Sequence, residues 1–211
     1  KHRHGIGQAK LIAESKLPVG GGTVEKLKKL EEAGFIISLI PYGHKDRGIY
    51  YLLDDQYCLF YLHWIEPVQK TITKKRTSAG YWLAQSRQTS WKVWAGYSFE
   101  SIRYKHIDDI RTALGIDPGA TEGTWRYQPK KNENATGAQI DLLFDRMDGA
   151  ITICEIKCSE NQFGIDKTYA KELLNKVEVF KKQTRTKKQI FLSMVTTMGL
   201  KPTMYSEEIV S

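Results

Sequence analysis

Three charged residues interrupt two apolar stretches in the second half of the chain, and their types suit phosphodiester chemistry. Asp141 lies in the stretch Gln-Ile-Asp-Leu-Leu, and Glu155 and Lys157 lie in Ile-Cys-Glu-Ile-Lys-Cys. Two carboxylates can hold Mg²⁺ or Mn²⁺ through oxygen ligands, and such a metal acidifies a bound water. We therefore predict a catalytic group in which Asp141 and Glu155 are metal ligands and Lys157 orients the water.

The elements around these residues are expected to place them side by side. The ranges 138–145 and 150–157 are apolar runs joined by Arg-Met-Asp-Gly, which predicts a β-hairpin. Residues two apart on a strand leave the same face, so Glu155 and Lys157 should point together, with Asp141 on the neighbouring strand. The alternative interpretation is an internal salt bridge among the same side chains, because charges inside apolar strands need partners.

The remaining second half predicts a mixed sheet flanked by helices, in the α/β (α+β) class. Residues 98–114 have apolar side chains at helical spacing and predict one amphipathic helix that Gly115 ends. A short strand at 124–127, a helix at 167–182 and a strand at 189–196 complete a domain that spans 98–211.

The first 65 residues have the element order of a winged helix-turn-helix domain. We expect a helix at 7–14, a second helix at 23–33 capped by Thr23, and two strands at 35–40 and 49–53 around a polar tip. Gly34 should end the second helix. An aromatic helix at 57–65 follows.

Five basic side chains of this domain are candidates for nucleic-acid binding. In the DNA-binding interpretation, the second helix enters a groove and the polar tip reaches phosphates. The candidates are Lys26, Lys28, Lys29, Lys45 and Arg47. The alternative is that the tip packs against another domain while the lysines face water, and the glutamates of the same helix favour it.

Residues 66–97 form a basic, aromatic connector between the two domains. The whole chain has a net charge of +8, and this connector has six Lys/Arg against one acid. That balance favours an acidic partner such as nucleic acid, although a solvated linker explains it equally well. We expect Trp82, Trp91 and Trp94 to pack against a domain surface, which we favour over base stacking.

Bulk features narrow the class of protein. No apolar run is long enough to span a bilayer, so we expect no membrane association. Three unpaired cysteines are typical of reduced thiols in a cytoplasmic protein. No Gly-x-x-x-x-Gly-Lys-Ser/Thr motif is present, so ATPase activity is not expected from this chain. Because the first residue is Lys1, we expect the chain to be part of a longer protein.

The acid and lysine pattern resembles the PD-(D/E)xK nuclease superfamily, with Ile140-Asp141 as its second motif and Glu155-Ile-Lys157 as its third. The family's proline before the aspartate is absent. The Phe99-Glu100 pair resembles the additional acid of that superfamily and implies Glu100 as an outer metal ligand. Over nearly its whole length the chain resembles the C-terminal half of archaeal-type P-loop ATPases, the DUF234 region. That resemblance implies an AAA-like ATPase domain elsewhere in the full-length protein.

The leading hypothesis is a DNA-binding, Mg²⁺-dependent nuclease-like module of an ATPase, which hydrolyses or formerly hydrolysed phosphodiester bonds. A second hypothesis is a catalytically inactive DNA-binding or regulatory module of the ATPase. A third is a protein-interaction scaffold that uses the polar tip and the aromatic connector, and an oligomer is compatible with all three.

Overall fold

The computed structural model describes residues 5–44, 48–74, 80–130 and 136–210. Contacts divide the chain into two compact units. The first contains Lys1–Leu39 and Gly48–Tyr104, and the second contains Ile40–Arg47 and Lys105–Ser211. The segment Ile40–Arg47 therefore belongs to the second unit, although it connects two strands of the first along the chain.

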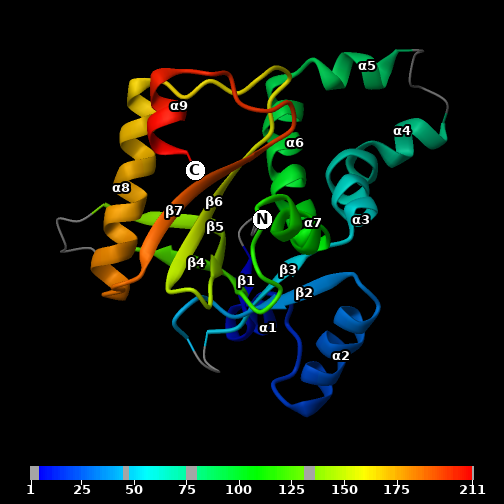
Figure 1. The fold of residues 1–211 in the computed structure, drawn as a ribbon. Helices are drawn as coiled ribbons and strands as arrows, with labels where there is room; N and C mark the ends of the chain where they lie inside the picture. Colours follow the sequence, from blue (N-terminus) through cyan, green and yellow to red (C-terminus); the bar gives the residue numbers. More distant parts are fainter. Residues whose placement is uncertain (1–4, 45–47, 75–79, 131–135, 211) are drawn as a thin grey trace. The chain divides into compact units, whose positions relative to one another are not determined.

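The first unit contains a small antiparallel sheet and two helices near its N-terminal end (Figure 1). The elements are β1 (Ile6–Gly7), α1 (Gln8–Glu14), α2 (Gly21–Glu32), β2 (Ile36–Leu39) and β3 (Tyr50–Leu53), with strand order β1-β3-β2. Gly34, at φ +74°, follows α2 as predicted. The prediction of Thr23 as the cap is wrong, because α2 begins two residues earlier and the Thr23 hydroxyl instead donates to the Pro18 carbonyl at 2.6 Å.

The rest of the first unit is helical and aromatic. It contains α3 (Gln56–Phe60), a π-helical turn (Tyr61–Ile65), a 3₁₀ turn (Glu66–Val68), α4 (Gln69–Thr73), α5 (Tyr81–Ser86) and α6 (Thr89–Ile102). The predicted connector is thus largely helical in its described part. The ring centroids of Trp91 lie 5.1 Å from Trp64 and 5.3 Å from Trp94, and Trp94 lies 5.8 Å from Phe60. The tryptophans pack with one another and with the aromatic helix, as expected.

The second unit is built on a four-stranded mixed sheet, as the sequence predicts (Figure 1). Its elements are α7 (Ile107–Ala113), β4 (Thr121–Tyr127), β5 (Ala138–Asp145), β6 (Ala150–Lys157), α8 (Lys167–Thr184), β7 (Gln189–Thr196) and α9 (Met204–Ile209). The strand order is β4-β5-β6-β7. Only the β6–β7 pair is parallel, and α8 is the crossover between these two strands.

The single helix predicted at 98–114 is wrong. Helix α6 ends at Ile102, a 3₁₀ turn spans Arg103–Lys105, and α7 begins at Ile107. The apolar residues Ile102 and Ile107 are five apart, so one continuous helix would place them on different faces, and the break between α6 and α7 removes that constraint. The two units also meet along the chain at this break.

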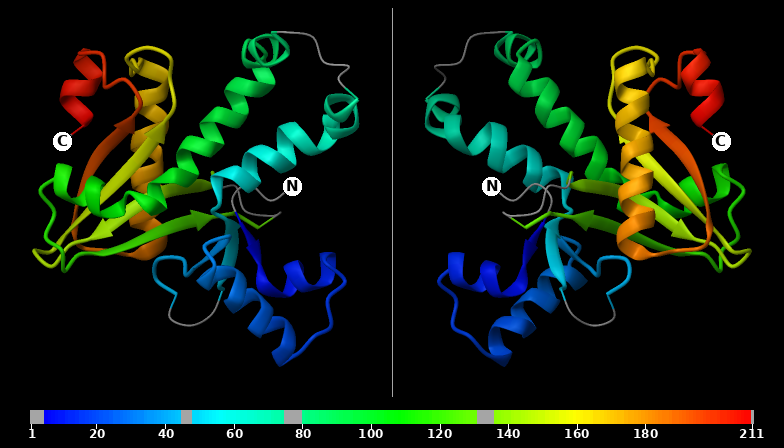
Figure 2. Two further views of the ribbon diagram at one scale, coloured as in Figure 1. Left: turned by 90° about the vertical axis from the view of Figure 1, so that its right-hand side faces the viewer. Right: turned by 90° about the vertical axis from the view of Figure 1, so that its left-hand side faces the viewer.

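Helix α8 covers one face of the sheet and forms the core of the second unit with it (Figure 2). Leu173 and Phe180 of α8 are fully buried against Leu143, Ile151 and Ile153 of the central strands. With 18 residues α8 is the longest described helix, yet its outer face is charged. No helix in the described part of the chain is long and apolar enough to cross a membrane.

Candidate functional site

The structure places the three predicted catalytic residues on the two central strands of the second unit. Asp141 lies on β5, and Glu155 and Lys157 lie on β6. The Lys157 ammonium Nζ is 3.0 Å from Glu155 Oε1, so these two side chains share one face of the sheet as predicted. Glu155 is 2% exposed and Asp141 is 8% exposed, while the Lys157 side chain is about one-third exposed. Both acids are therefore buried, whereas the lysine that contacts Glu155 is accessible.

A bulge in β5 lies at Asp141. Gly123 of β4 pairs with Leu143 and Trp125 pairs with Ile140, so two residues of β5 oppose the single residue between them on β4. Such bulges redirect side chains and are frequent beside functional sites. The Gln139 side-chain amide donates to Asp141 Oδ1 at 3.3 Å and helps to hold the redirected carboxylate.

Helix α8 adds two residues to the site that the sequence did not single out for chemistry. The Lys176 ammonium contacts Glu155 Oε2 at 2.6 Å, and the Tyr169 hydroxyl donates to Glu155 Oε1 at 3.0 Å. Lys176 is seven residues after Tyr169 and three after the buried Leu173, so it belongs to the inward stripe of the helix. A lysine on an otherwise apolar stripe was the signal that could have identified it.

The charges of the site balance one another. Burial raises the pKa of the Glu155 carboxyl, but Lys176 and then Lys157 lower it by more, so the net pKa is below its ordinary value. Burial raises the pKa of the Tyr169 hydroxyl, and the negative charges of Glu155 and Asp141 raise it further. Both carboxylates therefore act on the same hydroxyl. Two ammonium groups and a neutral phenol therefore contact the Glu155 carboxylate, and Asp141 lies near the same phenol.

Carboxylate oxygens are the kind of ligand that a hard divalent cation prefers. Asp141 and Glu155 offer oxygen ligands from adjacent strands, and Mg²⁺ is commonly held by one or two carboxylates together with water and substrate phosphate. Among the described residues no group of three or more His, Cys, Asp or Glu side chains is arranged to bind a metal, so a dedicated protein cage is not part of this site. A bound metal would supply an acidified water and charge neutralisation.

The additional predicted ligand lies in the other unit. Glu100 is part of α6, which belongs to the first unit, whereas Asp141 and Glu155 belong to the second. The β5–β6 hairpin therefore does not determine the position of Glu100 relative to the other two acids. The role of Glu100 as an outer ligand stays a prediction.

The predicted nucleic-acid contacts of the first unit are partly neutralised by their own helix. On α2, Lys28 lies 3.7 Å from Glu32 and Lys29 lies 2.8 Å from Glu25, while Lys26 is exposed. Pairs this exposed are weak, so they lower the attraction of α2 for phosphate without abolishing it. Lys45 and Arg47 lie outside the described residues.

The described part of the polar tip that precedes Lys45 belongs to the second unit. Tyr42 is not part of the first sheet. Its backbone N–H donates to Thr124 O at 2.7 Å, and its ring centroid lies 5.6 Å from that of Phe180. The described part of the polar tip thus packs on β4 and α8 of the second unit, in the manner of the alternative interpretation.

Comparisons with family models, with curated proteins and with solved structures found no match to this chain. The geometry of the second unit is therefore the basis for a functional proposal.

Proposed function

We propose that the second unit is a metal-dependent phosphodiester-cleaving domain of the PD-(D/E)xK type, which acts on DNA. The observation that carries the proposal is the Asp141, Glu155 and Lys157 group on adjacent central strands. Its supporting geometry is the 3.0 Å contact between Lys157 and Glu155, beneath a partly exposed ammonium group. A mixed sheet with a parallel β6–β7 pair and a crossover helix agrees with a restriction-endonuclease-like fold.

The side chains of the site have distinct roles in this proposal. Asp141 and Glu155 hold Mg²⁺ or Mn²⁺, and Lys157 binds the attacking water or a phosphoryl oxygen through its exposed end. Lys176 and Tyr169 fix the Glu155 carboxylate, and the two lysines keep it ionised despite its burial. They are positioning residues, because they act on the substrate only through Glu155.

The first unit acts in the same proposal as a winged-helix DNA-binding domain of an AAA-like ATPase. Its two helices followed by a hairpin in a three-stranded antiparallel sheet support this interpretation. Lys26 is the α2 lysine best suited to contact phosphate, since the neighbouring Lys28 and Lys29 pair with glutamates of the helix.

A nicking assay tests cleavage. Supercoiled plasmid DNA is incubated with the protein and Mg²⁺ or Mn²⁺, and with the variants Lys157→Ala and Asp141→Asn. We expect relaxed plasmid with the native protein, at least about a hundredfold less with either variant, and none in excess chelator. Lys167→Ala, at the exposed start of α8, is the matched control and should cleave normally. Equal cleavage by Lys157→Ala would contradict the proposal.

A second candidate function is a DNA-binding module with an inactive nuclease fold. The observation that favours it is that both Glu155 oxygens already accept contacts, Oε1 from Lys157 and Tyr169 and Oε2 from Lys176. The charge of a carboxylate with these contacts is compensated without a metal. Native protein that binds DNA but leaves plasmid intact with both metals would support this candidate over the first.

A further inference from the structure

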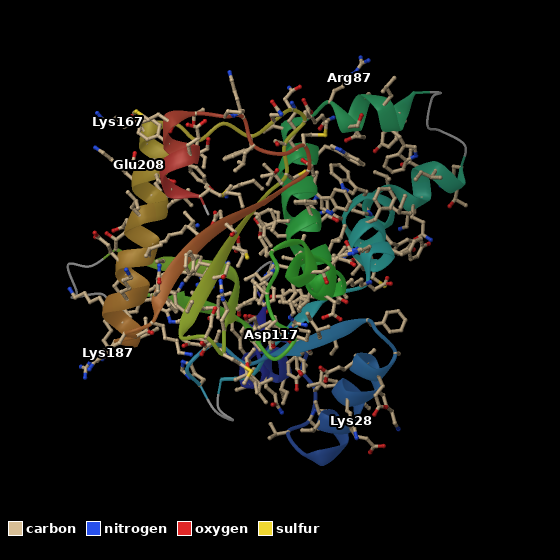
Figure 3. All side chains as sticks on the ribbon, viewed as in Figure 1. Lys28, Arg87, Asp117, Lys167, Lys187 and Glu208 are labelled. Atoms are coloured by element: carbon tan, nitrogen blue, oxygen red, sulfur yellow. The ribbon has the colours of Figure 1, made fainter. Side chains whose placement is uncertain are left out.

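The end of α8 and the residues that follow it form a strongly basic segment. Between 181 and 188 the chain has five Lys/Arg and no acid, whereas the second unit as a whole is nearly neutral. Lys181, Lys182, Arg185 and Lys187 are exposed, and the Lys187 side chain projects outward beyond the helix (Figure 3). We call residues 181–188 the basic segment.

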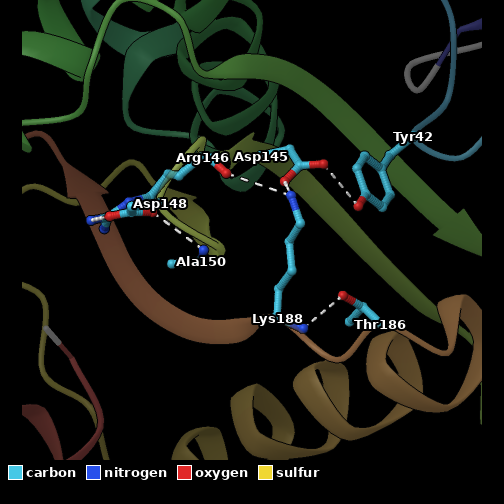
Figure 4. A network of polar contacts seen from close by, with 7 residues as sticks. All are labelled: Tyr42, Asp145, Arg146, Asp148, Ala150, Thr186 and Lys188. Carbon is cyan, nitrogen blue, oxygen red and sulfur yellow. Dashed lines mark hydrogen bonds and ion pairs between the residues drawn. The ribbon is translucent and has the colours of Figure 1, made fainter.

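The acid beside the basic segment does not neutralise these four cations. Asp145 Oδ1 pairs with Lys188, and Asp145 Oδ2 accepts a hydrogen bond from the Tyr42 hydroxyl at 3.1 Å (Figure 4). Both carboxylate oxygens are thus engaged, and only Lys188 is paired. None of the other four cations has an ion-pair partner within the described ranges, even though Glu178 is one turn away.

Stabilisation of α8 explains only some of the cations in the basic segment. The negative end of a helix dipole favours cations in the last turn, which accounts for Lys181 and Lys182. It does not account for Lys187, which follows the helix. Arg185 lies at the position where glycine is preferred, with φ +54° and ψ +26°, a left-handed conformation that is unfavourable for a residue with a Cβ. Backbone stability therefore does not explain an arginine at this position, and its side chain is exposed.

A polar hollow adjoins the basic segment. It has a volume of about 600 Å³ and is lined by Tyr42, Gly43, His44, Trp125, Asp145, Gln183, Thr184 and Thr186. The carboxylate in this lining, Asp145, is already engaged by Lys188 and by the Tyr42 hydroxyl. His44, Gln183 and Thr186 contribute an imidazole, an amide and a hydroxyl, which are groups that donate hydrogen bonds to phosphate oxygens. Exposed cations around such donors suit an anion with several oxygens.

We propose that the basic segment and the adjoining hollow bind the phosphate backbone of a nucleic acid. The partner class follows from the charge and from the spacing of several cations along one segment, which matches a repeating phosphodiester chain. The inference rests on the nucleic-acid part of the proposed function and is independent of cleavage. It also moves the main phosphate contact away from α2, where Lys28 and Lys29 pair with glutamates and, of the described lysines there, only Lys26 does not.

Two triple variants with equal changes of charge test the proposal. The first replaces Lys181, Lys182 and Lys187 by Gln. The matched control replaces Lys167, Lys171 and Lys201 by Gln, which are exposed lysines elsewhere in the same unit. Binding to a fluorescent DNA duplex, and to one strand of that duplex, is measured by anisotropy over a salt series in chelator, so that no cleavage occurs.

We expect the first variant to bind the duplex at least about tenfold more weakly near 0.1 M salt, with a salt slope smaller by up to about 2.7, since each phosphate contact contributes roughly 0.9. For the single strand the slope falls by about 0.7 per contact, and the larger loss identifies the preferred form. The control should change affinity by less than about threefold, because charges farther away than about 10 Å are screened. Equal losses in both variants, or no binding by native protein, would overturn the proposal.

Arg185→Gly separates charge from structure. We expect weaker DNA binding and a melting temperature equal to or above that of the native protein, because glycine accepts the left-handed conformation. A lower melting temperature with unchanged affinity would show that the arginine is structural and would refute the use of its charge. A last measurement tests binding of the native protein to vesicles that contain phosphatidylserine. Binding to these vesicles but not to DNA would contradict the proposal and would indicate that the basic segment contacts a membrane surface.

The outcomes distinguish this proposal from the nuclease proposal. If Lys157→Ala abolishes nicking but binds DNA normally, and the first triple variant loses DNA binding, both proposals stand. If native protein never nicks DNA while the first triple variant loses binding, only the cleavage proposal fails. If nicking occurs and the first triple variant binds like native protein, only the basic segment is excluded.

Discussion

Lys176 is the residue whose removal tests the candidate site most directly. Among the described residues it is the sole ammonium group in contact with Glu155 Oε2, at 2.6 Å, and the carboxylate is 2% exposed. Lys176→Met keeps the length and the apolar stem of the side chain but removes the charge. Glu155 would then keep only the contacts of Lys157 and Tyr169, both on its other oxygen.

The expected loss of stability follows from burial. Removing one partner of a fully buried ion pair costs about 3–5 kcal/mol, because a buried charge is left uncompensated. Here Lys157 remains and the Lys176 side chain is one-quarter exposed, so water reaches the vacated position and we expect about 2–3 kcal/mol at neutral pH. Urea unfolding measures the loss. Hydrogen exchange of β6 and α8 assigns it to the second unit.

The pH dependence of that loss distinguishes an ion pair from simple packing. The pKa of Glu155 is depressed in the native protein, so its ion pairs stabilise the fold fully above the ordinary value of 4.5. This contribution disappears as pH falls from 4.5 through the depressed pKa, where the carboxyl is protonated in both states. The difference in unfolding free energy between native protein and Lys176→Met should therefore shrink across that window.

The control for this experiment is Lys171→Met on the exposed side of the same helix, which should change stability by less than about 0.5 kcal/mol. A loss for Lys176→Met that is equally small, or one that is the same at neutral pH and in acid, would refute the ion-pair arrangement.

Three further predictions concern the second unit. Leu173→Ala should cost about 2–5 kcal/mol in urea unfolding, because Leu173 is fully buried between α8 and the sheet. Gly149→Ala should cost about 1–2 kcal/mol in the same assay, since Gly149 has φ +83° and open space around the added Cβ, so that only backbone strain contributes. Cys158 should react rapidly with a thiol reagent, and Cys154 only after unfolding, because Cys154 is buried and burial raises its pKa to about 12. Equal reaction rates for the two thiols in the native protein would contradict this.

The sequence predicts the central strands of the second unit well because local signals agree there. β5, β6 and β7 occupy the predicted ranges, and α8 extends two residues beyond its predicted end. In β5 and β6, eight-residue apolar runs are separated by a turn that ends in glycine, so strand propensity and turn chemistry point to the same structure. The contact between Glu155 and Lys157 then follows from strand alternation alone.

Tertiary contacts explain what the sequence did not provide. Lys176 and Tyr169 reach Glu155 from a helix that follows later in the chain, and only the fold brings them there. The break after Ile102 is also a tertiary feature, because intrinsic propensity permits either one helix or two. The same holds for Tyr42, which looks like part of a surface tip in the sequence and is packed against Phe180 in the fold.

The membership of Ile40–Arg47 in the second unit makes the two units discontinuous in sequence. A fragment that starts at Lys105 would lack Tyr42, and with it the ring against Phe180 and the hydroxyl that binds Asp145. Cutting the chain between the units therefore removes a piece of one of them, so cleavage of the chain within this segment should destabilise the four-stranded sheet of the second unit, although the cleaved bond lies far away in the primary structure. The segment that links β2 to β3 of the first unit is therefore a structural part of the second unit.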